Sequence, residues 1–335
     1  MSGRPAADTW PAMPKVELHC HLEGSVRPAT FLDLARSRVQ LPTEDPAHVY
    51  DYTDMASFMV VFERLCASVA TAEDVARITQ EALEDAAASG VVYREMFCNP
   101  TLHPLPYQDF LAGATEGITR ARDATGIVAR LIPAIFRGQA PEVATELARA
   151  VAAGPRDVVV GLGMDGDELL GPPEEFADAY AVARDGGLAC TAHAGERFSP
   201  HEVQVCLDLL GCTRIDHGYG IVEDPELTAR ARDAGTLFTY AWLSTTYNYR
   251  GPLHRHPFLR MRDAGLRMSL GSDDPAMGGT SLAGDYRSVA RALGFTAEDF
   301  IRQNLDALES SWLDGPDREA VRSRLWPGTT TPEGA

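Results

Sequence analysis

Lysine is almost absent from this chain: Lys15 is the only one in 335 residues. Basic residues are scarce as a class, since 30 Lys and Arg face 48 Asp and Glu and leave a formal net charge of −18. Nucleic acids and anionic membranes attract basic surfaces, so this balance argues against both as partners. Long hydrophobic runs are also missing, because no apolar stretch approaches the roughly 20 residues that a transmembrane helix needs.

The six cysteines are dispersed and form no Cys-x-x-Cys pair. Most of them lie in apolar runs, which predicts buried free thiols in a reducing cytoplasm rather than disulfides or a thiolate metal site. The first residues lack the basic-then-apolar order of a secretory signal. We therefore expect a cytoplasmic protein, and the 45% hydrophobic content is sufficient for a large core.

Short apolar runs alternate with amphipathic stretches along most of the chain. Eight βα units in about 300 residues fit an α/β fold of the (β/α)8 TIM barrel type better than a doubly wound sheet. We expect one barrel domain over 13–326, with disordered termini at 1–12 and 327–335. The expected strands are 15–20, 91–97, 128–136, 158–163, 189–193, 214–217, 236–242 and 267–271, and the expected helices include 72–89, 107–124, 141–153, 173–186, 200–211 and 224–234.

Metal-binding residue types stand at the ends of several of these strands. His19 and His21 end the first, His193 ends the fifth, and Asp273 ends the eighth. A His-x-His pair on one strand directs both imidazoles to the same face, because side chains alternate with period two. In barrels of this kind, chemistry is located at the carboxyl ends of the strands. Three histidines and one carboxylate suit Zn²⁺, with a position left for water.

Two further residues at the same ends carry protons readily. Glu196 follows His193 in TAHAGE, and His217 ends the sixth strand. A water molecule activated by zinc needs proton carriers of these types. Many barrel hydrolases instead hold two metals bridged by a carboxylated lysine at the end of strand four. Here that end reads GLGMDGDE, and the only lysine is Lys15, so we expect one zinc per chain.

The segments PKVELHCHLEG, TAHAGE, RIDHGYG and SLGSDDP resemble, in the same order, the signature segments of the adenosine deaminase family. The resemblance spans roughly residues 14–310. It implies that His19, His21, His193 and Asp273 bind the metal. It also implies that Glu196 protonates the purine ring at N1 and that His217 orients or deprotonates the attacking water.

The resemblance further implies contacts to the base. Asp274 would form a hydrogen bond with N7, and the backbone N–H of Gly166 would meet N3. Taken alone, Asp273-Asp274-Pro275 is explained as well by an ordinary turn or helix N-cap as by a functional role. The stretch 50–66 resembles the family's lid helix, where Phe58 and Phe62 share one face. They form either ordinary core packing or an apolar gate over the base.

Departures from the family pattern bear on the substrate. Glu23 stands in HCHLEG where nucleoside-specific members usually carry an Asp that binds the sugar 5′-hydroxyl, and Asp165 replaces a usual alanine. The longer side chain predicts altered sugar recognition, with Glu23 on the ribose side of the pocket. An aromatic and cationic loop from Trp242 to Arg250 either stacks on a substrate tail or packs on the barrel rim.

These observations predict a zinc-dependent hydrolase that removes the 6-amino group of an adenine-type purine. Adenosine or a 5′-modified adenine nucleoside is the first expected substrate, with free adenine and aminodeoxyfutalosine as alternatives. A barrel hydrolase acting on an amide or ester would leave Glu196 without an obvious task. A non-catalytic binding protein of the same fold is the third alternative, although no expected ligand or proton carrier is missing.

Overall fold

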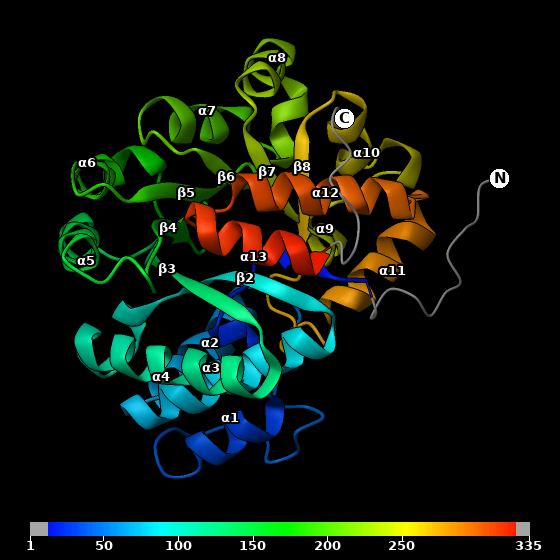
Figure 1. The fold of residues 1–335 in the computed structure, drawn as a ribbon. Coiled ribbons are helices and arrows are strands. Elements are labelled where there is room, and N and C mark those ends of the chain that lie inside the picture. The colour runs from blue at the N-terminus through cyan, green and yellow to red at the C-terminus, as the bar shows by residue number, and fades with distance from the viewer. Residues whose placement is uncertain (1–12, 326–335) are drawn as a thin grey trace.

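The computed structural model describes residues 13–325, so the ranges expected to be disordered, 1–12 and 327–335, lie outside it. Eight parallel strands form one sheet in the order β1-β2-β3-β4-β5-β6-β7-β8, and the expected (β/α)8 barrel is confirmed (Figure 1). The strands are β1 (Lys15–Glu17), β2 (Val91–Cys98), β3 (Val128–Phe136), β4 (Gly161–Asp165), β5 (Ala189–Ala194), β6 (Arg214–His217), β7 (Leu237–Ala241) and β8 (Arg267–Gly271).

The barrel closes through backbone contacts between the first and last strands. The N–H of His21 donates to the carbonyl of Asp273 (N···O 2.9 Å), and the N–H of Asp273 donates to the carbonyl of His19 (3.2 Å). A Cβ at Gly271 would lie 2.3 Å from the His19 carbonyl oxygen, so the close approach of β8 to β1 requires glycine there. The seam between the two strands therefore runs through residues expected to hold the metal.

Helices surround the strands and cover the outer face of the barrel (Figure 1). Several begin with capping boxes, in which side chain and backbone satisfy each other's free groups, as Thr71 and Asp74 do for α3. The helices are α1 (Pro28–Ala35), α2 (Met55–Ser68), α3 (Ala72–Ala88), α4 (Tyr107–Thr125), α5 (Pro141–Ala152), α6 (Ala177–Asp185), α7 (Pro200–Asp208), α8 (Pro225–Ala234), α9 (Trp242–Asn248), α10 (Pro257–Asp263), α11 (Leu282–Leu293), α12 (Ala297–Ser310) and α13 (Gly315–Leu325).

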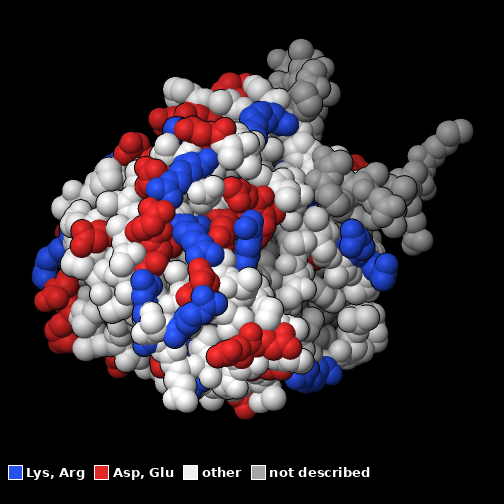
Figure 2. All heavy atoms as spheres, turned by 90° about the horizontal axis from the view of Figure 1, so that it is seen from below, with Lys and Arg blue, Asp and Glu red and all other residues white. Residues whose placement is uncertain are grey.

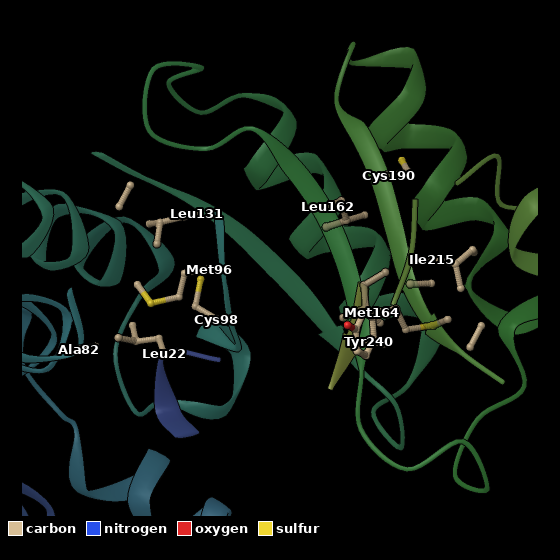
Figure 3. Close-up of a cluster of buried hydrophobic side chains, with 14 of the residues drawn as sticks. Leu22, Ala82, Met96, Cys98, Leu131, Leu162, Met164, Cys190, Ile215 and Tyr240 are labelled. Atoms are coloured by element: carbon tan, nitrogen blue, oxygen red, sulfur yellow. The ribbon is translucent and has the colours of Figure 1, made fainter. Parts of the chain in front are cut away.

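The main hydrophobic core lies between the barrel strands and these helices. Figure 3 shows Leu131, Leu162 and Ile215, which come from three different strands and are at most 1% exposed. Parallel strands covered on both faces need apolar side chains in both directions, which explains their near-continuous apolar sequences. All six cysteines are buried and free, as expected.

Helices α12 and α13 lie across the barrel in front of the strands in Figure 1. Trp312, between them, stacks on the guanidinium of Arg214, which is 4.0 Å from the ring centroid. Arg214 in turn donates from Nη1 to Glu95 Oε2 (2.7 Å) inside the barrel. A buried ion pair and an aromatic ring therefore fill the amino-terminal end of the barrel.

The surface mixes charges of both signs. On the face shown in Figure 2, acidic and basic side chains are interleaved rather than gathered into patches. Ion pairs link neighbouring helices of the molecule, among them Arg77 with Asp33 (2.6 Å) and Arg120 with Glu73 (2.8 Å). Among the described residues, no helix combines the length and apolar character that a membrane crossing requires.

Candidate metal and active site

Four side chains expected to bind metal converge at the carboxyl end of the barrel. His193 Nε2 lies 3.2 Å from His19 Nε2 and 3.1 Å from His21 Nε2. Asp273 Oδ1 is 3.3 Å from the Nε2 atoms of both His19 and His21. These atoms come from the segment after β1, from β5 and from the turn after β8, so the ends of three strands bring them to one point.

The other ring nitrogens of the three histidines face acceptors. His19 Nδ1 donates to the Thr239 carbonyl (3.1 Å). His21 Nδ1 faces Asp165 Oδ2 at 3.4 Å, and His193 Nδ1 faces Asp216 Oδ2 at 3.6 Å. An acceptor behind Nδ1 fixes the proton there and leaves the Nε2 lone pair free to bind a metal. All three Nε2 lone pairs therefore point toward the same place.

The spacing of these atoms fits a bound cation. With metal–nitrogen bonds of about 2.0–2.1 Å, ligands of a tetrahedral site stand about 3.3–3.4 Å apart. The observed separations of 3.1, 3.2 and 3.3 Å are close to this distance between ligands. Nitrogen lone pairs at this distance repel one another, and a cation between them removes the repulsion. His217 borders the same point, because His19, His193, His217 and Asp273 each offer an atom within 4.8 Å of the others.

Asp216 and Thr239 link two of the histidines from behind. Thr239 Oγ1 donates to Asp216 Oδ1 (2.6 Å), and Thr191 Oγ1 donates to Asp216 Oδ2 (2.8 Å). Burial opposes ionisation of Asp216, but the nearby imidazoles of His193 and His19 hold its pKa well below the usual range. Asp216 therefore supplies a fixed negative charge beneath the site.

Two site residues adopt a backbone conformation that L-amino acids rarely occupy. His217 has φ of 68° and Asp273 has φ of 62°. Such conformations cost about 1–3 kcal/mol and persist where the surrounding structure imposes them. Gly24 makes room for the neighbouring Asp274, since a Cβ there would lie 1.8 Å from its carboxylate oxygen. The turn after β8 is thus held against the turn after β1.

A cavity of about 330 Å³ opens beside the converging histidines. Its walls come from α2, from the turns after β4, β5 and β8, and from the segment after β7. Asp274 Oδ1 is a buried oxygen without a hydrogen-bond partner, and burial raises the pKa of this carboxyl to about 7. The expected site residues among its lining are His21, Phe58, Phe62, Gly166, His193, Glu196, His217, Asp273 and Asp274.

Glu196 presents its carboxyl to this cavity. Burial raises its pKa to about 8, and the carboxylates of Asp273 and Glu168 add to the shift. Glu168 accepts hydrogen bonds from the backbone N–H of Glu196 (2.9 Å) and of Arg197 (3.0 Å). Asn248 Nδ2 donates to Glu196 Oε1 (2.9 Å). A carboxyl with this pKa is mostly neutral at pH 7 and can donate a proton.

His217 is set up as a neutral imidazole. Burial lowers its pKa well below the ordinary value, and the imidazoles of His19 and His193 add to the effect. Its Nδ1 is 3.0 Å from the Tyr219 hydroxyl, which itself donates to the Ala241 carbonyl (3.1 Å). His217 Nδ1 is then the donor to that hydroxyl, which leaves Nε2 as an acceptor 3.9 Å from Glu196 Oε2.

Glu23 does not face the cavity in the way expected of a sugar-binding carboxylate. It is 0% exposed, and its Oε1 accepts hydrogen bonds from the Asn99 backbone N–H (2.9 Å) and from His103 Nε2 (2.9 Å). Asn99 Nδ2 donates in turn to Asp165 Oδ1 (2.8 Å), and Asp165 lines the cavity. The carboxylate at position 23 thus holds Asn99, which in turn holds Asp165.

Phe58 and Phe62 pack against the core and also lie at the cavity. Their rings stack with centroids 6.0 Å apart, they pack against the main core, and both line the cavity. The segment from Trp242 to Arg250, expected to be a loop, forms α9 through Asn248 and supplies one wall of the cavity. Sequence reasoning assigned no role to Glu168, Asn248 or Asp216. The acidic pair in MDGDE, directly after a strand, was the available signal for Glu168.

Comparisons with known proteins identify the family and the fold. The sequence model of the family described as adenosine deaminase matches residues 14–327. An adenine deaminase from Chelativorans sp. (strain BNC1) is 34% identical, over 93% of this chain and 98% of the relative. A crystal structure of a zinc-bound amidohydrolase from Burkholderia ambifaria superposes with a TM-score of 0.89 at 34% identity, covering 97% of this chain and 93% of that one. The adenine deaminase from Arthrobacter aurescens gives a TM-score of 0.86 at 28% identity, with coverage of 93% and 98%.

Proposed function

The chain belongs to the adenosine deaminase family, and from this premise we propose that it removes the 6-amino group of free adenine as ammonia. The observation that carries the proposal is the convergence of three imidazole nitrogens and one carboxylate oxygen beside the neutral acid Glu196. An enzyme that adds water to an aromatic ring carbon needs an activated water and an acid for the ring nitrogen, and this site holds residues for both tasks.

We assign His19, His21, His193 and Asp273 as the ligands of the metal, and the metal as zinc. A set of three nitrogens and one oxygen is typical of zinc, and the ligand spacing suits it. When bound, zinc supplies the Lewis acidity that makes water nucleophilic at neutral pH. His217, on the same rim, is assigned to proton transfer, because its Nε2 accepts and its Nδ1 is occupied by Tyr219.

The proton transfers fall to Glu196 and His217. His217 Nε2 takes the proton of the attacking water and orients its oxygen toward C6 of the base. Glu196 gives its own proton to N1, which neutralises the negative charge that develops on the ring. His217 then returns its proton to the 6-amino group, the C6–N6 bond breaks and ammonia leaves. The proton of the added hydroxyl goes to Glu196 as the carbonyl forms at C6, so both residues regain their starting states. Asp274 then serves as the partner for N7, and the backbone N–H of Gly166 serves N3. Phe58 and Phe62 cover the apolar face of the base and exclude water.

Free adenine is preferred over adenosine for a structural reason. The carboxylate of Glu23, at the position that would bind a sugar hydroxyl, is engaged by Asn99 and His103 within the protein interior. Glu23 is 0% exposed and does not line the cavity, so its carboxylate is not presented to a substrate hydroxyl. The relatives at 34% identity are named adenine deaminases, which supports the same choice. Adenosine, 5′-modified adenine nucleosides and aminodeoxyfutalosine remain the alternative substrates.

The test is ammonia release across adenine, adenosine and aminodeoxyfutalosine, with metal content measured on the same samples. We expect the highest kcat/KM for adenine. Glu196→Gln should keep its metal and lose about 10²–10⁴-fold in kcat. A preference for adenosine would overturn the substrate assignment alone. A native rate in Glu196→Gln would overturn the catalytic assignment.

A further inference from the structure

The cavity wall formed by α9 makes a direct contact with Glu196. Asn248, the last residue of this helix, donates from Nδ2 to Glu196 Oε1 at 2.9 Å. Leu243, Ser244, Tyr247 and Arg250 of the same segment also line the cavity. The segment therefore encloses the substrate space and at the same time touches the group that we propose as the acid.

The backbone and the carboxyl of Glu196 are held by different elements. Its backbone N–H is fixed by Glu168, which follows β4 and also binds the N–H of Arg197. Within residues 13–325, the amide of Asn248 is the hydrogen-bond donor that reaches its carboxyl. The terminal torsion of a glutamate side chain is broad, so a fixed backbone alone does not orient the carboxyl plane.

We propose that Asn248 is a positioning residue that determines which oxygen of Glu196 carries the proton. This inference rests on the proposed role of Glu196 as the acid for the purine ring. An amide N–H can donate only to an oxygen that accepts. Because Asn248 donates to Oε1, the proton of the neutral carboxyl belongs on Oε2, the oxygen 3.9 Å from His217 Nε2.

This arrangement makes the acid dependent on α9. If the end of the helix moves away, Glu196 keeps its backbone contacts to Glu168 but loses the group that fixes its plane and its proton. Reacting groups that are misplaced by about 1 Å can lose on the order of 10²-fold in rate. The position of α9 therefore determines both the shape of the cavity wall and the orientation of the Glu196 carboxyl.

The test uses Asn248→Ala and the nearly isosteric Asn248→Asp, with Thr246→Ala as the matched control. Thr246 is exposed on the same helix, and its hydroxyl donates within the helix, to the Leu243 carbonyl. Asn248→Ala should lower kcat roughly 10–100-fold with little change in KM or in metal content. Asn248→Asp keeps the shape but replaces the donor by an acceptor, so it should lose at least as much. Thr246→Ala should behave as the native protein.

A double-mutant cycle with Glu196→Gln separates positioning from general disruption of the helix. If Asn248 acts through the acid, Asn248→Ala should cause no further loss of kcat in the Glu196→Gln background. Equal losses in both backgrounds, or a native kcat in Asn248→Asp, would overturn the inference. Should Asn248→Ala not fold, the same cycle with Asn248→Asp decides the question. Failure of the proposed function is distinguishable, because the native protein would then release no ammonia or would tolerate Glu196→Gln.

Discussion

The two ends of this barrel treat buried charge in opposite ways. At the amino-terminal end, Glu95 is matched by Arg214 at 2.7 Å, and it also accepts hydrogen bonds from the Tyr93 hydroxyl (2.8 Å) and the Trp312 backbone N–H (2.7 Å). At the carboxyl-terminal end, histidines crowd together among carboxylates, and Asp274 Oδ1 has no hydrogen-bond partner among the described residues. The amino-terminal end pairs a buried carboxylate with a buried cation, although Nε and Nη2 of Arg214 have no hydrogen-bond partner within residues 13–325. The carboxyl-terminal end, in the same part of the chain, leaves the carboxyl of Asp274 without any cation beside Oδ1.

The difference shows what each end contributes. The ion pair of Glu95 and Arg214 joins β2 to β6 and brings two opposite buried charges together. Converging lone pairs and an unpartnered carboxylate are costly in the folded chain, and a bound cation or substrate compensates for that cost. Stability and binding are therefore placed at opposite ends of the same eight strands, as is general for barrels of this kind.

The largest effect is expected at the carboxyl end, on removing a metal ligand. His193→Ala should reduce metal content from near one equivalent to near zero and abolish ammonia release, because His193 Nε2 contacts both other imidazoles. Elemental analysis of protein purified without added metal measures this. His201→Ala is the control, since His201 is exposed and pairs with Glu174 on the surface. Two equivalents of metal, both needed for activity, would contradict a mononuclear site.

A substitution at the amino-terminal end should lower the stability of the protein and leave its activity almost unchanged. Arg214→Met leaves Glu95 buried without its cation, and breaking such a pair costs about 3–5 kcal/mol in the free energy of unfolding. Urea denaturation measures the loss, while kcat of the folded enzyme should stay within about twofold. The exposed pair of Arg120 and Glu73 provides the control, because Arg120→Met should change stability little. A fall in kcat larger than the control's would show that the two ends are coupled.

The smallest effect concerns a buried acid outside both clusters. Asp285 accepts a hydrogen bond from Thr280 Oγ1 (2.8 Å), its Oδ2 has no partner, and burial raises its pKa to about 8. Between an unfolded pKa near 3.9 and this folded value, the native state binds a proton that the unfolded state does not. The contribution to stability is therefore complete at acidic pH and is lost as the pH rises toward 8.

Asp285→Asn removes that titration. Thermal unfolding from pH 5 to pH 9 should show a flatter dependence of Tm on pH than in the native protein, with a higher Tm than the native protein at the alkaline end. Thr280→Ala, which removes the hydrogen bond but keeps the acid, should keep the slope. Parallel curves for native protein and Asp285→Asn would mean that Asp285 is already ionised in the folded state.

The sequence predicted the barrel well because its periodicity is a local property. The strands at 128–136, 214–217 and 267–271 have the bounds expected from their apolar runs. The first strand was predicted over 15–20 but ends at Glu17, because beyond it the chain makes only isolated bridges, such as those of Cys20 and His21. This irregularity falls at the proposed metal ligands, and no hydrophobic pattern records it.

The partners behind the site were not predictable in the same way. Side chains of β6 alternate between the inside and the outside of the barrel, and Asp216 is one of those that point inward. Its contacts with Thr239 and Thr191 depend on how β5, β6 and β7 twist relative to one another. Glu23 was expected on the sugar side from a motif, and only the three-dimensional position of Asn99 and His103 shows where its carboxylate goes. Motifs identify residue types, whereas contacts across strands decide their orientation.

The seam between β1 and β8 has a consequence for how the protein is made. His21 and Asp273 meet through a backbone hydrogen bond, although one follows the first strand and the other follows the last. During synthesis from the amino terminus, His19 and His21 emerge long before Asp273, so the complete set of proposed ligands does not exist until the ring of strands can close. Contacts between such distant parts of a chain form slowly. If the proposed metal binds, its tight capture would therefore report that the last strand has reached the first.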